Sequence, residues 1–187
     1  EDEKEPRLRN MAQQLHSFTR HGIYRKYFDG PNSLDYKNNL VVLELDHLKG
    51  KKHLQQVVLL QLIAQLNNEF YLGDRRVPKI LLVDEAWEAF EDPMVAKFLE
   101  GAFRRMRKAA AAPVVVTQSL RDLYNSASGE AIANNAANVI VLRQNGEAIE
   151  ALKESGRFNI GDYGYEMLKS LHTEPGQYSE VLFRSGT

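Results

Sequence analysis

Cysteine is absent from the 187 residues of this chain. Structural disulfides and thiolate metal sites are therefore excluded, and the composition suits a reducing compartment. A folded chain of this length buries roughly 70% of the surface that its unfolded form exposes. Packing alone is therefore sufficient for stability, without a covalent or metal cross-link.

Long apolar runs and an excess of one charge are absent as well. No run approaches the roughly 20 apolar residues that a membrane span requires, and the first twenty residues contain no hydrophobic signal core. We therefore expect any role at a membrane to depend on partners. The 24 basic and 25 acidic residues leave a net charge of -1, so contact with DNA would need a local basic patch.

What the chain does contain is an alternation of short apolar runs and longer helical patterns. Strands are predicted at residues 40–45, 79–84, 113–117, 138–142 and 178–183. Helices are predicted within residues 8–18, at 53–72 and 93–108, in a short segment ending at 135, and at 147–155 and 161–171. The first four strands are almost continuously apolar, which is typical of a parallel sheet covered on both faces. The fold class predicted for residues 1–187 is therefore a single α/β domain, a parallel sheet flanked by helices.

Two adjacent carboxylates end the second predicted strand. The sequence KILLVDEAW at residues 79–87 places Asp84 and Glu85 directly after an apolar run. Open α/β folds bind ligands at the carboxyl ends of their strands. Asp84 would face Mg²⁺ through its water shell, and Glu85 would polarise the water that attacks a γ-phosphate, as in a hydrolytic Walker B motif. The alternative is a strand that happens to end in acidic residues, since the pattern is short.

The next predicted strand also ends in polar residues. The sequence VVVTQ places Thr117 and Gln118 at the corresponding edge of the sheet. Gln118 could donate a hydrogen bond to a γ-phosphate, or bind the attacking water, and report hydrolysis to the rest of a motor. A solvated strand end is the alternative for Gln118. Together the two strand ends resemble those of RecA-like motors.

One component of a nucleotide site is missing from the sequence. A phosphate-binding loop follows the pattern G-x-x-x-x-G-K-[ST], because its backbone N–H groups and lysine hold the phosphates. Gly50 and Lys51 come nearest to it, but the earlier glycine and the following Ser or Thr are absent. In RecA-like proteins this loop precedes the Walker B strand. We therefore expect it upstream of Glu1, with this chain as the C-terminal part of a RecA-like P-loop ATPase domain.

Seven segments, in order along nearly the whole chain, resemble one protein family. They are PRLR at 6–9, YFDGP at 27–31, VVLEL at 41–45, LQQVV at 54–58, YLGDRR at 71–76, VDEAW at 83–87 and YSEV at 178–181. In these segments the chain is similar to the C-terminal ATPase domain of TraC-like (VirB-type) conjugative type IV secretion ATPases. The resemblance implies a RecA-like motor domain that uses ATP and Mg²⁺, with Asp84 and Glu85 in the Walker B roles and Gln118 as the polar sensor.

The same resemblance gives a role to a basic helix end. The sequence RRMRK at 104–108 resembles an arginine-rich helix end of the family, from which Arg105 or Arg107 would reach a nucleotide in an adjacent subunit. A guanidinium suits this task because it neutralises charge that develops on the transferred phosphoryl group. The alternative is that these cations only compensate the helix dipole. Where the family has a tyrosine and glycines after this helix, the present chain has alanines at 109–112.

The resemblance implies a protein that assembles as a hexamer and hydrolyses ATP to power pilus assembly and the transfer of DNA or protein. It implies a cytoplasmic location, peripheral to the bacterial inner membrane, with inner-membrane components of the secretion system as partners and DNA as a possible contact. Two other functions remain open from the residues. One is a DNA-pumping ATPase of the FtsK/HerA type, which shares the strand-end carboxylates, and the other is a non-catalytic assembly domain.

Overall fold

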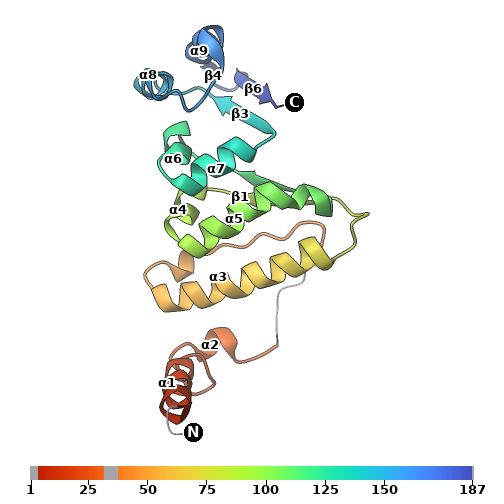
Figure 1. The fold of residues 1–187 in the computed structure, drawn as a ribbon, viewed down its shortest axis with the longest axis vertical. Helices are drawn as coiled ribbons and strands as arrows, with labels where there is room; N and C mark the ends of the chain where they lie inside the picture. The colour runs from red at the N-terminus through yellow and green to blue at the C-terminus, as the bar shows by residue number, and fades with distance from the viewer. Residues whose placement is uncertain (1–3, 32–37, 187) are drawn as a thin grey trace. The chain divides into compact units, whose positions relative to one another are not determined.

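In the computed structural model, residues 4–31 and 38–186 are described, and Figure 1 traces them from the N-terminus to the C-terminus. The chain divides into two compact units, Glu1–Val58 and Leu59–Thr187. The prediction of one domain over residues 1–187 stays a prediction.

The first unit is mainly helical. It contains α1 (Lys4–His16), the short α2 (Arg25–Phe28), a 3-10 turn η1 (Asp46–Leu48) and the first turns of α3 (Lys52–Asn67). The ring of Phe18 packs against Tyr24 and Phe28, with centroids 5.4 and 5.5 Å apart, and this cluster holds the turn after α1. The N-terminal helix predicted from the apolar pattern is confirmed.

The prediction of a strand at residues 40–45 is wrong. This segment is irregular and leads into η1. Leu40 is 80% exposed and Val42 is 72% exposed. A strand is stable only when a neighbour completes its backbone hydrogen bonds, and no described residue pairs with this segment. Residues with a high propensity for strands are therefore not sufficient to form a strand in this segment.

The second unit is built around a parallel strand pair, β1 (Lys79–Val83) and β2 (Ala111–Val115), in which Lys79 is opposite Ala111 and Val83 is opposite Val115. Between them lie α4 (Ala86–Glu91), α5 (Pro93–Arg105) and the 3-10 turn η3 (Met106–Ala109). Asp92 begins α5: its Oδ1 accepts hydrogen bonds from the N–H groups of Met94 and Val95 at 2.8 and 3.2 Å, ahead of the rigid Pro93.

The two strands and their connecting helix were predicted, but β2 begins two residues earlier than expected. Ala110 lies in the left-handed region with φ 53° and ends η3. The chain turns there, so Ala111 and Ala112 already pair with β1. Helix α3 and the π-helical turn η2 (Asn68–Leu72) that continues it confirm the helix predicted at 53–72.

The fourth predicted strand exists but does not extend the parallel pair. β3 (Asn138–Leu142) pairs antiparallel with β6 (Val181–Ser185), and a small hairpin joins β4 (Thr173–Glu174) to β5 (Tyr178–Ser179). The described residues thus form three two-stranded sheets in place of one continuous parallel sheet. Helices α7 (Ala127–Asn135), α8 (Gly146–Ser155) and α9 (Gly161–Ser170) match the predictions, and the five-residue α6 (Leu120–Tyr124) was not predicted.

One face of the strands in the second unit carries the core. Leu81, Val83 and Val115 pack against buried side chains of α5 to α9, with Phe158 and Leu168 among the most deeply buried. Residues that alternate with them point away: Ile80 is 71% exposed and Leu82 is 60% exposed. The exposed apolar residues of the β3–β6 pair are Ile140, Leu142, Val181 and Phe183.

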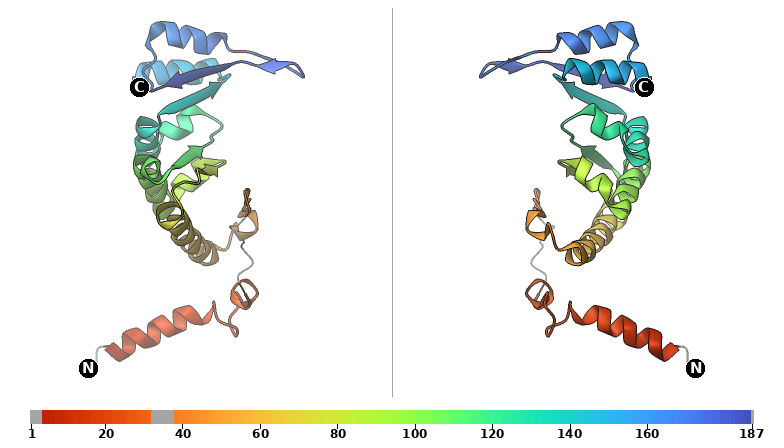
Figure 2. Two further views of the ribbon diagram at one scale, coloured as in Figure 1. Left: turned by 90° about the vertical axis from the view of Figure 1, so that its right-hand side faces the viewer. Right: turned by 90° about the vertical axis from the view of Figure 1, so that its left-hand side faces the viewer.

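The expectation that both faces of the sheet are covered is therefore wrong for this unit. Its helices cover one face, and no element of the unit lies over the other (Figure 2). Residues on both faces of the strands are apolar, although the helices of this unit cover only one of the two faces.

Candidate functional site

The carboxyl ends of β1 and β2 form the first part of the candidate site. Because the two strands are parallel and in register, the residues that follow them meet at one edge. They line a shallow depression of about 170 Å³ made by Asp84, Glu85, Val116, Thr117 and Gln118. The structure therefore brings together the two predicted Walker B carboxylates and the predicted polar sensor. We call this edge the acidic edge.

Backbone hydrogen bonds fix the acidic edge. The N–H of Val116 donates to the carbonyl of Val83 at 2.9 Å, and the N–H of Ala86 donates to the carbonyl of Val116 at 3.0 Å. The strand ladder thus extends one step beyond β1 and β2. The buried Ala86 then begins α4. Asp84 and Glu85 therefore lie in a turn between two residues, Val83 and Ala86, that are both hydrogen-bonded to Val116.

Glu85 has an unusual backbone conformation. Its φ of 48° and ψ of 43° place it in the left-handed region, which costs a residue with a Cβ roughly 1 to 2 kcal/mol. Its N–H donates to Oδ1 of Asp84 at 2.9 Å, which orients the neighbouring carboxylate. Both side chains are exposed. Strained residues of this kind concentrate at functional sites, and Glu85 lines the depression.

Local bonds also hold the polar end of β2. The hydroxyl of Thr117 donates to the carbonyl of Ser119 at 3.0 Å, and the Ser119 hydroxyl accepts from the N–H of Arg121 at 3.1 Å, where it caps α6. Gln118 lies between these two anchored residues and is exposed at the edge. Its amide can donate and accept hydrogen bonds with a ligand at the acidic edge.

The acidic edge suits Mg²⁺ only as part of a larger site. Among the described residues, no group of three or more His, Cys, Asp or Glu side chains gathers as a metal centre. Mg²⁺ does not need one, since it keeps several waters and commonly binds through one or two carboxylates and the phosphates of a nucleotide. Asp84 is placed to be such a carboxylate. A depression of 170 Å³ is smaller than a typical ligand pocket of about 300 Å³ or more.

The predicted arginines do not join the acidic edge. Arg105 ends α5 and Arg107 lies in η3, both before β2 begins. The five-residue strands separate this end of the pair from Asp84 by roughly 16 Å at 3.3 Å per residue. Within one chain, neither guanidinium can contact a phosphate held at Asp84. A contact with a phosphate held at Asp84 could therefore come only from another copy of the chain, whereas compensation of the helix dipole needs no such contact.

The end of the strand pair that carries Arg105 holds a second pocket. It has a volume of about 330 Å³ and is lined by Tyr71, Arg75, Arg105, Lys108 and Ala109. We call this end the basic edge. Sequence reasoning missed Tyr71 and Arg75. The available signal was their position, because both precede β1 by a few residues as Arg105 and Lys108 precede β2, and parallel strands begin at a common edge.

Comparison with known proteins places the chain in a family. Residues 2–172 match the model of the TraG P-loop domain, and the chain therefore belongs to this family of P-loop domains. Over 159 residues, 82% of this chain, it is 30% identical to protein TraC of Escherichia coli (strain K12). A solved structure of VirB4 of Thermoanaerobacter pseudethanolicus matches 99% of the chain with a TM-score of 0.63 and 21% identity, which shows the same fold.

The resemblance to TraC- and VirB-type secretion ATPases that the motifs indicated is thus confirmed, as is the α/β P-loop fold class. The chain spans 18% of the length of TraC and 49% of the VirB4 chain. Across residues 4–31 and 38–186, none of the helices combines the length and the apolar character of a membrane span.

Proposed function

We propose that this chain is the C-terminal part of the ATP-hydrolysing domain of a type IV secretion ATPase, and that the acidic edge is its hydrolytic half-site. The observation that carries the proposal is the gathering of Asp84, Glu85 and Gln118 at the carboxyl ends of two parallel strands. Family membership supports it. The phosphate-binding loop, which these 187 residues do not contain, is supplied by further residues of the longer protein.

Each residue of the acidic edge has a distinct task in this proposal. Asp84 binds Mg²⁺ of the Mg-ATP complex through its water shell, with its carboxylate oriented by the N–H of Glu85. When bound, the metal ion neutralises charge on the phosphates. Glu85 accepts a hydrogen bond from the attacking water and polarises it. Gln118 binds the same water or the γ-phosphate, and so links the state of the nucleotide to the start of α6.

Arg105 and Arg107 act in trans. Their place at the basic edge separates them from the acidic edge of their own chain, so the phosphate that they contact belongs to an adjacent copy. Such an arrangement requires a closed assembly, for which we propose a hexamer in the full-length protein. A guanidinium from a neighbouring subunit stabilises the transferring phosphoryl group.

In the cell, we propose that the assembled protein lies in the cytoplasm against the inner membrane, in contact with inner-membrane components of a secretion system. ATP hydrolysis there drives pilus assembly and the transfer of DNA or protein. The supporting observations are the likeness to TraC and VirB4 and the presence on one domain of carboxylates and cations at opposite edges. This separation couples hydrolysis to the arrangement of subunits.

The deciding experiment is Glu85→Gln in the full-length protein. We expect Mg-ATP binding to be retained and turnover to fall by roughly 10² to 10⁴, the usual contribution of a general base, because the amide keeps the shape but lacks the charge that polarises water. Phosphate release and nucleotide affinity are measured on the same preparation. Glu88→Gln, three residues further along on α4, is the matched control and should leave turnover unchanged.

Near-normal hydrolysis by Glu85→Gln would refute the Walker B assignment. Hydrolysis that appeared only with DNA would favour a DNA-pumping ATPase. If the full-length protein bound no nucleotide, the result would favour a non-catalytic assembly domain.

A further inference from the structure

The basic edge pocket, lined by Tyr71, Arg75, Arg105, Lys108 and Ala109, contains no carboxylate in its lining. Other cations nearby are neutralised within the chain: Arg104 pairs with Glu100 at 2.7 Å, and Arg76 pairs with Asp74 at 2.8 Å. Within the described residues, Arg75, Arg105 and Lys108 have no such ionic partner. Three positive charges therefore converge on one concavity without an internal counter-charge.

Local contacts hold two of these cations in place. Nε of Arg105 donates to the carbonyl of Gly101 at 3.3 Å, and a Cβ at Gly101 would stand 2.6 Å from the guanidinium nitrogen. Glycine at this position thus leaves room for the arginine to lie along α5. Lys108 belongs to η3, whose buried Met106 packs with Phe70 of η2 and with Ala111. The pocket is therefore built on packed elements.

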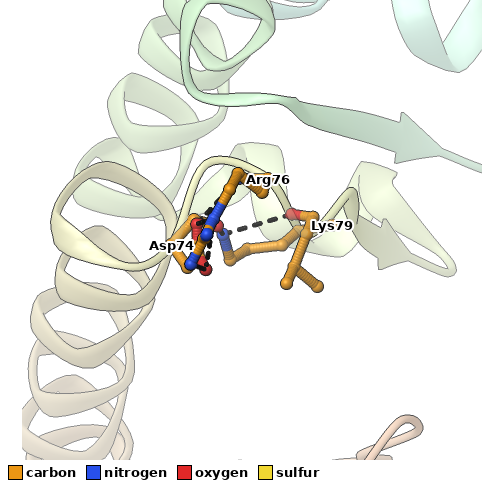
Figure 3. A network of polar contacts seen from close by, with 4 residues as sticks. Asp74, Arg76 and Lys79 are labelled. Carbon is orange, nitrogen blue, oxygen red and sulfur yellow. Dashed lines mark hydrogen bonds and ion pairs between the residues drawn. The ribbon is translucent and has the colours of Figure 1, made fainter.

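A polar network of Asp74, Arg76 and Lys79 holds the turn in which the third cation, Arg75, lies (Figure 3). Asp74 accepts hydrogen bonds from Nε and Nη2 of Arg76 at 3.1 and 2.8 Å and from its N–H at 2.9 Å, while Nζ of Lys79 donates to the carbonyl of Asp74 at 2.6 Å. The side-chain hydrogen bond from Arg76 lowers the pKa of Asp74, so this carboxylate is ionised and already paired. Arg75 lies between Asp74 and Arg76 in the sequence, takes no part in this network, and lines the pocket.

The size and charge of the pocket define the ligand class. Its 330 Å³ is one compact concavity of the size of a small-ligand site. A nucleic-acid strand would need a groove that follows successive phosphates, whereas a di- or triphosphate concentrates three or four negative charges in one place. Arginine forks match phosphate oxygens in pairs, and lysine binds phosphate as a point charge.

From these observations we infer that the basic edge pocket binds the phosphate chain of a nucleotide, with Arg75 and Lys108 joining Arg105 in holding it and Tyr71 forming the wall. This inference rests on the trans role proposed for Arg105 and extends it from one arginine to a preformed site. The nucleotide is the one whose metal ion is held at the acidic edge of a second copy. Arg75 is then a binding residue that was not evident from the sequence, and Lys108 was evident there only as part of the basic helix end.

The test uses the 187-residue chain with tripolyphosphate as the probe, without Mg²⁺ and at low ionic strength, followed by calorimetry and amide chemical shifts. We expect saturable binding of one tripolyphosphate per chain, with shifts centred on residues 71–76 and 105–109. Arg75→Ala combined with Lys108→Ala should weaken binding by about tenfold or more, because charge-assisted hydrogen bonds are lost. The charge-preserving Lys108→Arg should retain it. The matched control, Lys97→Ala with Arg20→Ala, removes two exposed cations elsewhere and should change affinity by less than about twofold.

Three outcomes would overturn the inference: no saturable binding, equal losses in the pocket and control variants, or an oligonucleotide that binds the pocket much more tightly than tripolyphosphate or ATP. ATP and adenosine separate the phosphate chain from the base, since only ATP should compete with tripolyphosphate. Because this assay involves neither Glu85 nor turnover, its failure leaves the hydrolytic assignment intact. Near-normal hydrolysis by Glu85→Gln would likewise leave phosphate binding at the basic edge untouched, because the tripolyphosphate assay measures it separately.

Discussion

The two edges of the β1–β2 pair differ in almost every chemical respect. The acidic edge presents Asp84, Glu85 and Gln118 in a depression of about 170 Å³. The basic edge presents Arg75, Arg105 and Lys108 around a pocket of about 330 Å³. One edge is suited to a metal ion and a water, and the other to phosphate oxygens. A complete phosphoryl-transfer site needs both kinds of group.

The strands that join the edges also keep them apart. A rigid five-residue spacer cannot fold back on itself, so the two sets of groups from one chain never meet. Two copies arranged head to tail can bring them together, and head-to-tail contacts close into rings when the rotation between copies permits. The comparison thus indicates why a motor domain with this layout would depend on assembly for activity.

The strongest test of this comparison mixes subunits of the full-length protein. Arg105→Ala or Arg107→Ala alone should lower turnover by about 10³ or more, the scale of arginine fingers, with little change in ATP affinity of the monomer. Mixing such subunits with Glu85→Gln subunits should restore part of the activity, because some interfaces then combine an intact arginine with an intact base. Phosphate release is measured as a function of mixing ratio.

A purely structural role for the arginines gives a different pattern. Loss of charge compensation at the end of α5 would cost roughly 0.3 to 1 kcal/mol of stability, with turnover per folded subunit intact. Inactive mixtures with unchanged melting temperatures would contradict both accounts and turn attention to Arg121 or Arg143.

The two edges share one backbone feature, and it provides a second test. Glu85 at the acidic edge and Ala110 at the basic edge both have positive φ, at 48° and 53°. Ala110→Gly should raise the free energy of unfolding by about 1 kcal/mol, because glycine adopts this conformation without steric cost. Glu85→Gly should likewise be more stable than Glu85→Ala by about 1 kcal/mol, although both should be inactive in the full-length protein.

Urea unfolding of the chain measures these differences, and Ala112→Gly is the matched control. Ala112 is exposed within β2 and has ordinary strand geometry, so glycine there should destabilise the chain by roughly 0.5 to 1 kcal/mol. If all three glycine variants lost stability equally, the left-handed conformations at the edges would be refuted.

The smallest expected effect concerns the turn beside the basic edge and depends on pH. Hydrogen bonds from Arg76 lower the pKa of Asp74 below its ordinary value of 3.8. A carboxylate with a lowered pKa in the folded state stabilises the protein above its unfolded pKa, and this contribution is lost as pH falls through the folded value. Asp74→Asn should therefore be slightly less stable than the parent chain at neutral pH.

As the pH falls below 3.8 and through the lower folded-state pKa of Asp74, the two proteins should converge, because the parent carboxylate then becomes protonated as well. Urea midpoints at a series of pH values check this expectation. Because the ion pair is fully exposed, the difference should also shrink in high salt. A difference that stayed constant across the whole range would show that Asp74 acts through shape and not through charge.

By itself, the sequence determined those features that depend on neighbours within a few residues. Asp92 and Pro93 set the start of α5 through a cap, and apolar runs located β1 and β3 to within a residue. The predicted Walker B carboxylates, Asp84 and Glu85, followed from the strand that they end. These signals are local because capping and side-chain periodicity act over one or two turns of chain.

Only the tertiary structure decided what pairs with what. The runs at 40–45 and 138–142 have similar composition, yet the first lacks a partner among the described residues and the second pairs antiparallel with β6. Likewise, Arg75 and Arg105 lie thirty residues apart in the sequence and meet only because β1 and β2 are parallel and begin at one edge. Strand partners and shared edges arise from contacts between distant segments, and composition within each segment does not encode them.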